Sequence, residues 1–315
     1  MTTAVQPIPT LVGMLTVTSV SRWFGEHQVL RDVSFEVRPG RMTGFIGANG
    51  AGKTTMMRII LGVLQTQQGT VTWDGAPLTQ SLRQRFGYMP EERGLYPKMK
   101  VAEQISWLGR LHRLSRSSAD RNTAHLLEAL DLSERAEDPL ETLSLGNQQR
   151  AQVAAALVHE PVMLMLDEPF SGLDPIAVET VLTVLKERAA RGVPVLFSSH
   201  QLEVVERLCD DVVIVSEGAV TAHGQRDELR ENFSQPRFEL VVAGDAGWVR
   251  DVPDVRVVDI DGPRAVFEPQ GVVQGNGSPH RPEQRVLRTA LDRGEVRSFS
   301  PLVPSLSEIF QEAAC

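Results

Sequence analysis

Glycines, a lysine and a threonine have the spacing of a phosphate-binding loop in the first quarter of the chain. The segment GANGAGKT follows the pattern G-x-x-x-x-G-K-[ST], between an apolar run and a helical pattern. Its glycines allow a tight bend that points backbone N–H groups at phosphate oxygens. We therefore expect Lys53 to bind the β- and γ-phosphates of a nucleotide and the Thr54 hydroxyl to bind Mg²⁺. The residues expected around the phosphates are Gly47, Ala48, Asn49, Gly50, Ala51, Gly52, Lys53, Thr54 and Thr55.

Two acidic residues follow a short apolar run later in the chain. Residues 162–166 are all apolar and predict a buried strand, and Asp167 and Glu168 come directly after it. Ligands bind at the carboxyl ends of the strands in open parallel sheets. We expect Asp167 to support Mg²⁺ and Glu168 to act as the general base on water. Taken alone, Asp167 could instead cap a helix.

Further motifs occur in order along the chain. Phe24 lies in SRWFGEHQVL, Glu91 lies in MPEERGLYPK, and Leu143–Asn147 reads LSLGN before Gln-Gln-Arg. Ser171–Asp174 reads SGLD, and His200 follows the apolar segment VLFSS. Together with the glycine loop and the acidic pair, these motifs resemble those of the ATP-binding-cassette (ABC) ATPases over roughly residues 14–231.

This resemblance implies roles for the single residues. Phe24 matches the aromatic residue that stacks on adenine, although by itself it could be a plain core aromatic residue. His200 matches the switch histidine that senses the γ-phosphate, although by itself it could be an ordinary histidine at a strand end. The resemblance thus implies ATP as the nucleotide, with Lys53, Glu168 and His200 as the catalytic residues.

The LSLGN segment resembles the family's LSGGQ signature. The resemblance implies that Ser144 and the Gly146 amide face the γ-phosphate bound by the opposite subunit, at the N-terminus of a helix. Asn147 and Asp174, in the signature and the D-loop, complete the expected nucleotide contacts. Two nucleotides would then lie between two subunits, either a homodimer or a pseudo-dimer with a paralogous ATPase.

Two positions depart from the family pattern. Glu91 stands where the family has the Q-loop glutamine, and it adds a negative charge beside the triphosphate. The signature has Leu145 for Gly and Asn147 for Gln. Together with the segment PEERGLYPKM, these variants resemble a subgroup of bacterial exporter ATPases of the sodium-export and daunorubicin-resistance type. The metal-binding residues are therefore expected to be Thr54, Glu91 and Asp167.

Alternating strands and helices must position these motifs. Short β-branched or apolar runs predict strands at residues 15–20, 29–37, 42–46, 69–73, 162–166, 193–197 and 212–215. Between about residues 99 and 158 the pattern is helical without strands. We predict an α/β fold, a P-loop NTPase cassette over residues 14–231, with a central mostly parallel sheet, an antiparallel β subdomain and a helical subdomain.

A second, smaller domain is expected over residues 237–315. Its pattern reads β-α-β-β-α-β, which predicts a ferredoxin-like α+β sandwich, followed by a helix at residues 305–313. No catalytic cluster occurs in it. The resemblance to the exporter subgroup extends to this ending and favours a regulatory or dimer-stabilising role over ligand sensing.

Composition limits the classes of function. The 315 residues carry a net charge of −8 and two cysteines, so a nucleic-acid partner and a disulfide framework are not expected. No apolar run approaches the ~18 residues of a membrane-spanning helix. The prediction is a cytoplasmic subunit that lies on the inner face of the cell membrane through a separately encoded transmembrane permease. It is expected to power the transport of an unidentified substrate, with export as the expected direction.

Two other classes fit less well. Cassette ATPases that act on ribosomes usually carry two cassettes, whereas this chain has one glycine loop, and those that act on DNA insert long coiled coils. A P-loop kinase or GTPase would not need the signature or the D-loop, and no N-K-x-D motif is present.

Overall fold

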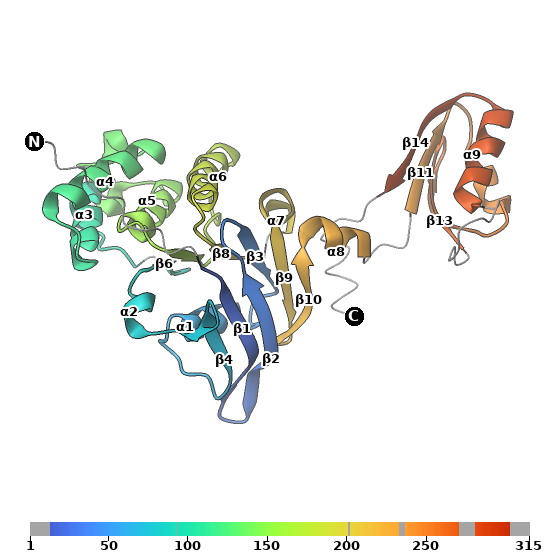
Figure 1. Ribbon diagram of the computed structural model, residues 1–315. Coiled ribbons are helices and arrows are strands. Elements are labelled where there is room, and N and C mark those ends of the chain that lie inside the picture. The colour runs from blue at the N-terminus through green and yellow to red at the C-terminus, as the bar shows by residue number, and fades with distance from the viewer. Residues whose placement is uncertain (1–12, 93, 201, 233–236, 271–280, 303–315) are drawn as a thin grey trace, which may run out of the picture. The chain divides into compact units, whose positions relative to one another are not determined.

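The computed structural model describes residues 13–92, 94–200, 202–232, 237–270 and 281–302. The chain divides into two compact units, with the boundary between Arg226 and Asp227 (Figure 1). Among the described helices, none combines the length and the apolar character that crossing a membrane requires.

A six-stranded sheet lies at the centre of the first unit. Its order is β10-β9-β3-β8-β7-β6, and all neighbours are parallel except β10 and β9. The strands are β3 (Met42–Ile46), β6 (Phe86–Met89), β7 (Met163–Leu166), β8 (Val195–Ser199), β9 (Asp211–Ser216) and β10 (Ala219–Gln225). Strands β3, β7 and β8 are buried along their whole length, which explains why they read as continuous apolar runs.

A four-stranded antiparallel sheet lies beside the glycine loop. Its order is β2-β1-β4-β5, and its strands are β1 (Leu15–Phe24), β2 (His27–Val37), β4 (Gln68–Trp73) and β5 (Ala76–Pro77). Apolar residues of this sheet share one core cluster with α1 (Lys53–Ile60) and the central sheet. The short helix α2 (Gln80–Arg83) precedes β6.

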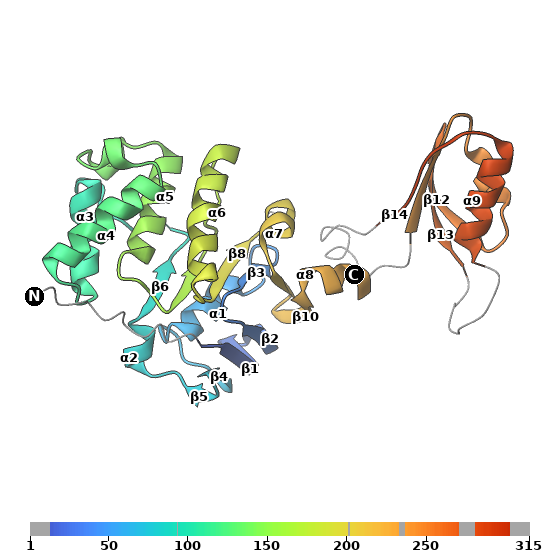
Figure 2. The ribbon, with the colours of Figure 1, turned by 45° about the horizontal axis from the view of Figure 1, so that its top comes forward.

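The described part of the chain between β6 and β7 forms helices. They are α3 (Val101–Leu111), α4 (Arg116–Ala129), the 3₁₀ helices η1 (Ser133–Arg135) and η2 (Leu140–Thr142), and α5 (Leu145–Leu157). Figures 1 and 2 show α3, α4 and α5 grouped together. Helices α6 (Pro175–Ala190) and α7 (Leu202–Leu208) connect the later strands. The predicted α/β fold class, with its parallel, antiparallel and helical parts, is confirmed.

The second unit is a small α+β domain. Its elements are α8 (Arg226–Asn232), β11 (Arg237–Val242), the 3₁₀ helix η3 (Gly247–Asp251), β12 (Val255–Asp261), β13 (Arg264–Pro269), α9 (Pro282–Arg293) and β14 (Val296–Leu302). The antiparallel sheet has the order β12-β13-β11-β14, and its core includes Leu240, Phe267 and Val286. The helix predicted at residues 305–313 lies outside the described residues.

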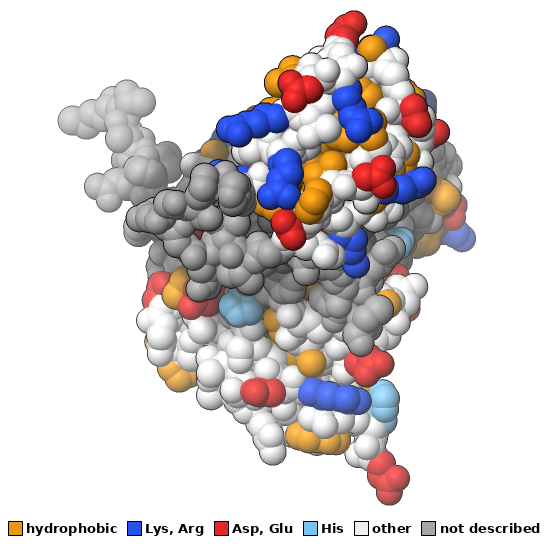
Figure 3. Space-filling view, turned by 90° about the vertical axis from the view of Figure 1, so that its right-hand side faces the viewer, with side chains coloured by type: hydrophobic (Ala, Val, Ile, Leu, Met, Phe, Trp, Pro, Cys, Tyr) orange, Lys and Arg blue, Asp and Glu red, His pale blue; other side chains and the backbone are white. Residues whose placement is uncertain are grey.

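Ion pairs connect neighbouring strands of the sheet in the second unit. Glu268, on β13, is 2% exposed and binds Arg237 at 2.8 Å and Arg256 at 2.7 Å. Burial alone would raise the pKa of Glu268, but hydrogen bonds from both arginines outweigh it, so the pKa lies below its ordinary value. On the face drawn in Figure 3, basic and acidic side chains are interspersed among apolar ones.

Candidate functional site

The glycine-rich segment connects β3 to α1, and neighbouring atoms leave no room for a side chain at two of its glycines. A Cβ at Gly47 would lie 2.5 Å from the Val215 carbonyl oxygen. Gly52 has a φ of 99°, and a Cβ there would lie 2.6 Å from Leu30 Cδ2. Only glycine fits these two positions, because a side chain would collide and positive φ strains other residues.

Lys53 lies inside this loop. Its ammonium donates hydrogen bonds to the carbonyl oxygens of Gly47, at 2.6 Å, and Ala48, at 3.2 Å. The residue is 7% exposed, and it begins helix α1, whose N-terminus carries a partial positive charge. A cation and a helix N-terminus at one place can bind the phosphates of a nucleotide.

Three oxygen-bearing side chains form a chain beside the loop. The Thr54 hydroxyl donates to Asp167 Oδ2 at 2.9 Å, and the Ser198 hydroxyl donates to Asp167 Oδ1 at 2.5 Å. Asp167 is 1% exposed and follows β7 directly. Hydroxyl and carboxylate oxygens are the ligands that Mg²⁺ prefers, so Thr54 and Asp167 fit this ion.

Glu168 is held at several points. Its backbone lies in the left-handed region, with a φ of 53°, which is unusual for a residue other than glycine. Its N–H donates to Ser198 Oγ and its carbonyl oxygen accepts from Gln149 Nε2, both at 2.9 Å. Its carboxylate lies 2.9 Å from His200 Nδ1. A carboxylate fixed in this way can act as a general base on a water molecule that is bound next to it.

Residues from these motifs surround one pocket of about 300 Å³. Its lining residues are Val29, Asn49, Gly50, Gly52, Lys53, Thr54, Thr55, Glu91, Asp167 and Glu168. The pocket brings Glu91, which follows β6, to the residues of the loop and of the acidic pair. Among the described residues, no group of three or more His, Cys, Asp and Glu side chains has the geometry of a metal cage. Mg²⁺ commonly binds through one or two carboxylates and substrate phosphates instead.

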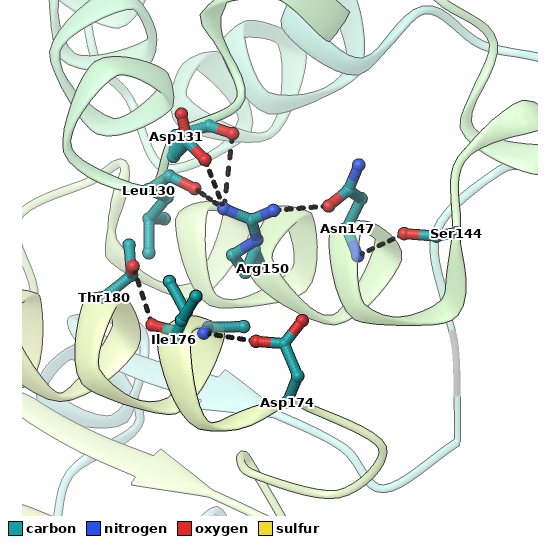
Figure 4. Close-up of polar contacts among 9 residues, drawn as sticks. Leu130, Asp131, Ser144, Asn147, Arg150, Asp174, Ile176 and Thr180 are labelled. Carbon is teal, nitrogen blue, oxygen red and sulfur yellow. Dashed lines mark hydrogen bonds and ion pairs between the residues drawn. The ribbon is translucent and has the colours of Figure 1, made fainter.

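The signature residues lie elsewhere, at the start of α5. Ser144 caps this helix by accepting the Asn147 N–H at 3.3 Å. Arg150 donates to Asn147 Oδ1 at 2.5 Å and to the Leu130 carbonyl oxygen at 2.8 Å (Figure 4). Because Arg150 holds the oxygen of the Asn147 amide, the NH₂ group of that amide remains as a donor.

Asp174 lies close to the signature. It caps α6 by accepting the Ala177 N–H at 2.8 Å (Figure 4). A Cβ at Gly146 would lie 3.6 Å from Leu173 Cδ2, so the signature and the D-loop are neighbours. The described signature and D-loop residues are absent from the lining of the Lys53 pocket. One copy of the chain therefore holds two separate groups of predicted nucleotide-binding residues.

Phe24 lies at the end of β1 and is 47% exposed. The Arg22 guanidinium lies 5.0 Å from the centre of its ring. Phe24 is thus neither in the core nor among the residues that line the pocket. Its stacking on adenine stays a prediction.

Two polar residues were missed in the sequence. Ser198 joins Asp167 to the backbone of Glu168, and Gln149 holds the Glu168 carbonyl oxygen from α5. Both are buried. The only signal for them was their position inside the segments VLFSSH and LSLGNQQR, which the motifs had marked for other residues.

Ser198→Ala is expected to lower both stability and turnover. It leaves the Glu168 N–H and one Asp167 oxygen without their partner, which costs about 1–3 kcal/mol in the free energy of unfolding. Because the backbone N–H of Glu168, the proposed general base, loses its hydrogen-bond partner, kcat should fall by a larger factor than the affinity for ATP. Urea unfolding and steady-state kinetics measure these effects.

The matched control is Thr43→Val, since the Thr43 hydroxyl is buried in the neighbouring β3 and has no hydrogen-bond partner in the described structure. Equal losses in both variants would contradict the role of Ser198.

Known proteins are similar to this chain in sequence. A family model described as "ABC transporter" matches residues 30–171, and one described as "ATP-binding protein DrrA1-3-like, C-terminal domain" matches residues 224–314. The uncharacterized ABC transporter ATP-binding protein YhaQ of Bacillus subtilis (strain 168) is 34% identical over 301 residues, which cover 95% of this chain and 98% of that protein.

An export protein and a solved structure are also similar. The Nod factor export ATP-binding protein I of Cupriavidus metallidurans is 35% identical, over 70% of this chain and 73% of that protein. The solved structure of an ATP-binding subunit of an ABC transporter aligns with a TM-score of 0.65 and 34% identity, over 70% of this chain and 93% of that one.

Proposed function

From the premise that this chain belongs to the ATP-binding subunits of ABC transporters, which are ATPases that power transport, we propose that it drives export through a separate transmembrane permease. The observation that carries the catalytic part is the fixed Glu168 carboxylate in the same pocket as Lys53. Support for export comes from the segment PEERGLYPKM, which resembles that of an exporter subgroup, and from a relative that is named for export.

The residues of the pocket and the neighbouring His200 have different roles in hydrolysis. Lys53, the loop N–H groups and the α1 N-terminus bind and orient the phosphates of ATP. Glu168 accepts a proton from the attacking water, and His200 holds the Glu168 carboxylate and faces the γ-phosphate. Thr54 and Asp167 would hold Mg²⁺, which would neutralise charge on the transferred phosphoryl group. Catalysis then consists of positioning and charge stabilisation.

A second copy supplies the rest of the site. Ser144, Gly146 and Asn147 present donors at the N-terminus of α5, away from the Lys53 pocket of their own chain. Their hydroxyl, N–H and NH₂ groups suit an anion such as the γ-phosphate. We therefore propose a head-to-tail dimer, with either an identical or a paralogous ATPase, in which each signature completes the other copy's pocket.

The permease is proposed to bind the helical part of the first unit. The segment from Leu95 to Leu108, which includes most of α3, borders a groove that can receive a cytoplasmic helix of the membrane subunit. Such docking would couple ATP-driven closure to transport and would hold the chain on the inner face of the membrane. For the second unit we propose a regulatory or dimer-stabilising role.

Glu91→Gln is expected to reduce the dependence of ATP binding on Mg²⁺. The carboxylates of Glu91, Asp167 and Glu168 share one pocket, so removing one weakens the repulsion of the triphosphate. Because Glu91 is exposed, we expect ATP without Mg²⁺ to bind only a few-fold tighter, or about 1 kcal/mol. The gain in affinity from Mg²⁺ should shrink by a similar factor. Titration calorimetry with and without Mg²⁺ measures both.

The neighbouring glutamate is the control for this variant. Glu92 is also exposed, but it does not line the pocket, so Glu92→Gln should leave both affinities unchanged. A Glu91→Gln protein with wild-type affinities in both conditions would rule out a role for Glu91 at the metal or the phosphates.

Vanadate trapping and membrane purification test the proposed function together. With ATP, Mg²⁺ and vanadate, the protein should form a trapped pair of ATPase subunits, seen as a doubled mass in light scattering. From membranes, the tagged chain should co-purify with a protein that has several membrane spans. A vanadate-treated protein that remains single would refute the dimer. Recovery bound to ribosomes, without a membrane protein, would refute the transporter assignment.

A further inference from the structure

Arg150, on the second turn of α5, connects the signature to the end of helix α4 (Figure 4). Its Nη2 donates to Asn147 Oδ1 at 2.5 Å, and its Nη1 donates to the Leu130 carbonyl oxygen at 2.8 Å. The same Nη1 lies 3.3 Å from the Asp131 carbonyl oxygen and 3.2 Å from Asp131 Oδ2. Leu130 is the C-cap residue of α4. One side chain thus joins the C-terminus of one helix to the first turn of another.

These contacts determine which end of the Asn147 amide faces away from the protein's own hydrogen bonds. A guanidinium has donors and no acceptor, so the amide atom that faces Arg150 must be the oxygen. The NH₂ group then points away from Arg150, as Figure 4 shows. The backbone N–H of Asn147 donates to the Ser144 hydroxyl at 3.3 Å, so both the backbone and the amide are held. At the start of a helix, such an NH₂ group is a preorganised donor for an anion.

The guanidinium of Arg150 is itself fixed. Its side chain is 13% exposed, whereas the side chain of Asp131 is 88% exposed. An ion pair with so exposed a carboxylate is screened by water and contributes little. The guanidinium is therefore held mainly by the neutral oxygens of Leu130 and Asn147. Because the two Nη groups have fixed directions in one plane, the contact with Leu130 sets the direction in which Arg150 holds the Asn147 amide.

From these contacts we propose that Arg150 is a positioning residue of the signature, which orients the Asn147 amide toward the γ-phosphate bound by the partner copy. The proposal rests on the proposed function, because it requires the head-to-tail dimer. Arg150 does not touch the nucleotide and acts through Asn147. A variant of Arg150 should therefore impair hydrolysis in the pocket of the other copy, while the pocket of its own copy stays intact.

The preceding residue of α5 serves the other site. Gln149 is 4% exposed, and its Nε2 donates to the Glu168 carbonyl oxygen at 2.9 Å. Successive residues of an α-helix are rotated by about 100°, so Gln149 and Arg150 have different neighbours. In the dimer, Gln149 would support hydrolysis in its own copy and Arg150 would support it in the partner. Gln149 is therefore a matched control from the same helix.

Mixed pairs test which pocket Arg150 serves. Arg150→Met, checked for folding by thermal unfolding, should retain about a tenth of the wild-type turnover, because a donor to a charged group is misplaced. Lys53→Ala lacks the loop cation but keeps an intact signature. At equal total protein, a one-to-one mixture of the two should reach about a quarter of the wild-type turnover, since half of randomly formed pairs contain one intact site. If Arg150 served its own pocket, the mixture would be less active than Arg150→Met alone, and the proposal would be overturned.

Two further mixtures make the result specific. Gln149→Met has its defect in its own pocket, so mixing it with Lys53→Ala should lower turnover below that of Gln149→Met alone. The mixture of Lys53→Ala with Ser144→Arg tests the dimer without Arg150. If that mixture regains activity and the Arg150→Met mixture does not, the role of Arg150 is refuted and the dimer stands. If neither gains activity, the dimer of the proposed function is refuted, and the role of Arg150 with it.

A double-mutant cycle tests whether Arg150 acts through Asn147. Asn147→Ala removes the amide, so Arg150→Met should lower turnover no further in that background. Equal fold-losses from Arg150→Met with and without the Asn147 amide would overturn the proposal, because Arg150 would then serve only to connect α4 to α5. If Arg150→Met does not fold, Arg150→Lys takes its place in both experiments, since an ammonium lacks the planar fork that makes the two contacts.

Discussion

Glu168→Gln is expected to reduce ATP turnover by about 10³-fold and to leave ATP binding close to the wild-type level. The amide keeps the size of the side chain but cannot accept the proton of the attacking water. Glu168 is 7% exposed and its backbone is held by Ser198 and Gln149, so its carboxylate has a fixed place in the pocket. Phosphate release under steady-state conditions measures turnover, and titration calorimetry measures binding.

A second glutamate in the same backbone conformation provides the control. Glu160 has a φ of 54° but is exposed, beyond the end of α5. Glu160→Gln therefore removes one charge from a left-handed position without touching the pocket, and turnover should not change. Turnover that survives in Glu168→Gln would refute the assignment of the base. Loss of ATP binding together with turnover would show that the charge of Glu168 serves binding instead.

Two inactive variants are expected to restore activity when they are mixed. Lys53→Ala disables the loop, and Ser144→Arg blocks the signature, so each protein alone should be inactive. In a head-to-tail pair of one copy of each, the intact loop of one copy meets the intact signature of the other. Half of randomly formed pairs are mixed and each has one intact site, so about a quarter of the wild-type activity should return.

The same mixture distinguishes a shared site from a site within one copy. If loop and signature served the same copy, every molecule in the mixture would lack one of them and activity would stay absent. A mixture of Lys53→Ala with Glu168→Gln is the control, because both residues line the same pocket of the same copy. Each mixed pair then has two defective sites, and no activity should return.

Much of the first unit could be predicted because its signals are local. The strands β3 and β7 are buried on both faces and read as apolar runs, and the glycine loop needs glycine where other residues would collide. The weaker strands β6 and β10 were not predicted. Strand β6 is four residues long, and β10 is a partly exposed edge strand whose pattern resembles that of a loop.

The supports of the catalytic residues could not be predicted from local patterns. Ser198 reaches Asp167 because β8 pairs in parallel with β7, with Leu166 opposite Phe197. Gln149 reaches Glu168 from α5, which packs against β6 and α6. Both contacts depend on the pairing register and on packing between segments that are far apart in the chain, and a sequence pattern carries neither.

The sequence by itself determined the phosphate loop, the acidic pair, the signature and the order in which they follow each other, because each needs particular residue types at short spacing. The family resemblance led us to expect Glu91 at the metal, and the tertiary structure shows that Glu91 lines the Lys53 pocket whereas Ser144 and Asn147 do not. The tertiary structure alone decided that Gln152 Oε1 and His159 Nδ1 are buried without hydrogen-bond donors in the described structure. The physical reason is that whether a polar group is satisfied depends on its neighbours in space, and these are set by strand register and helix packing.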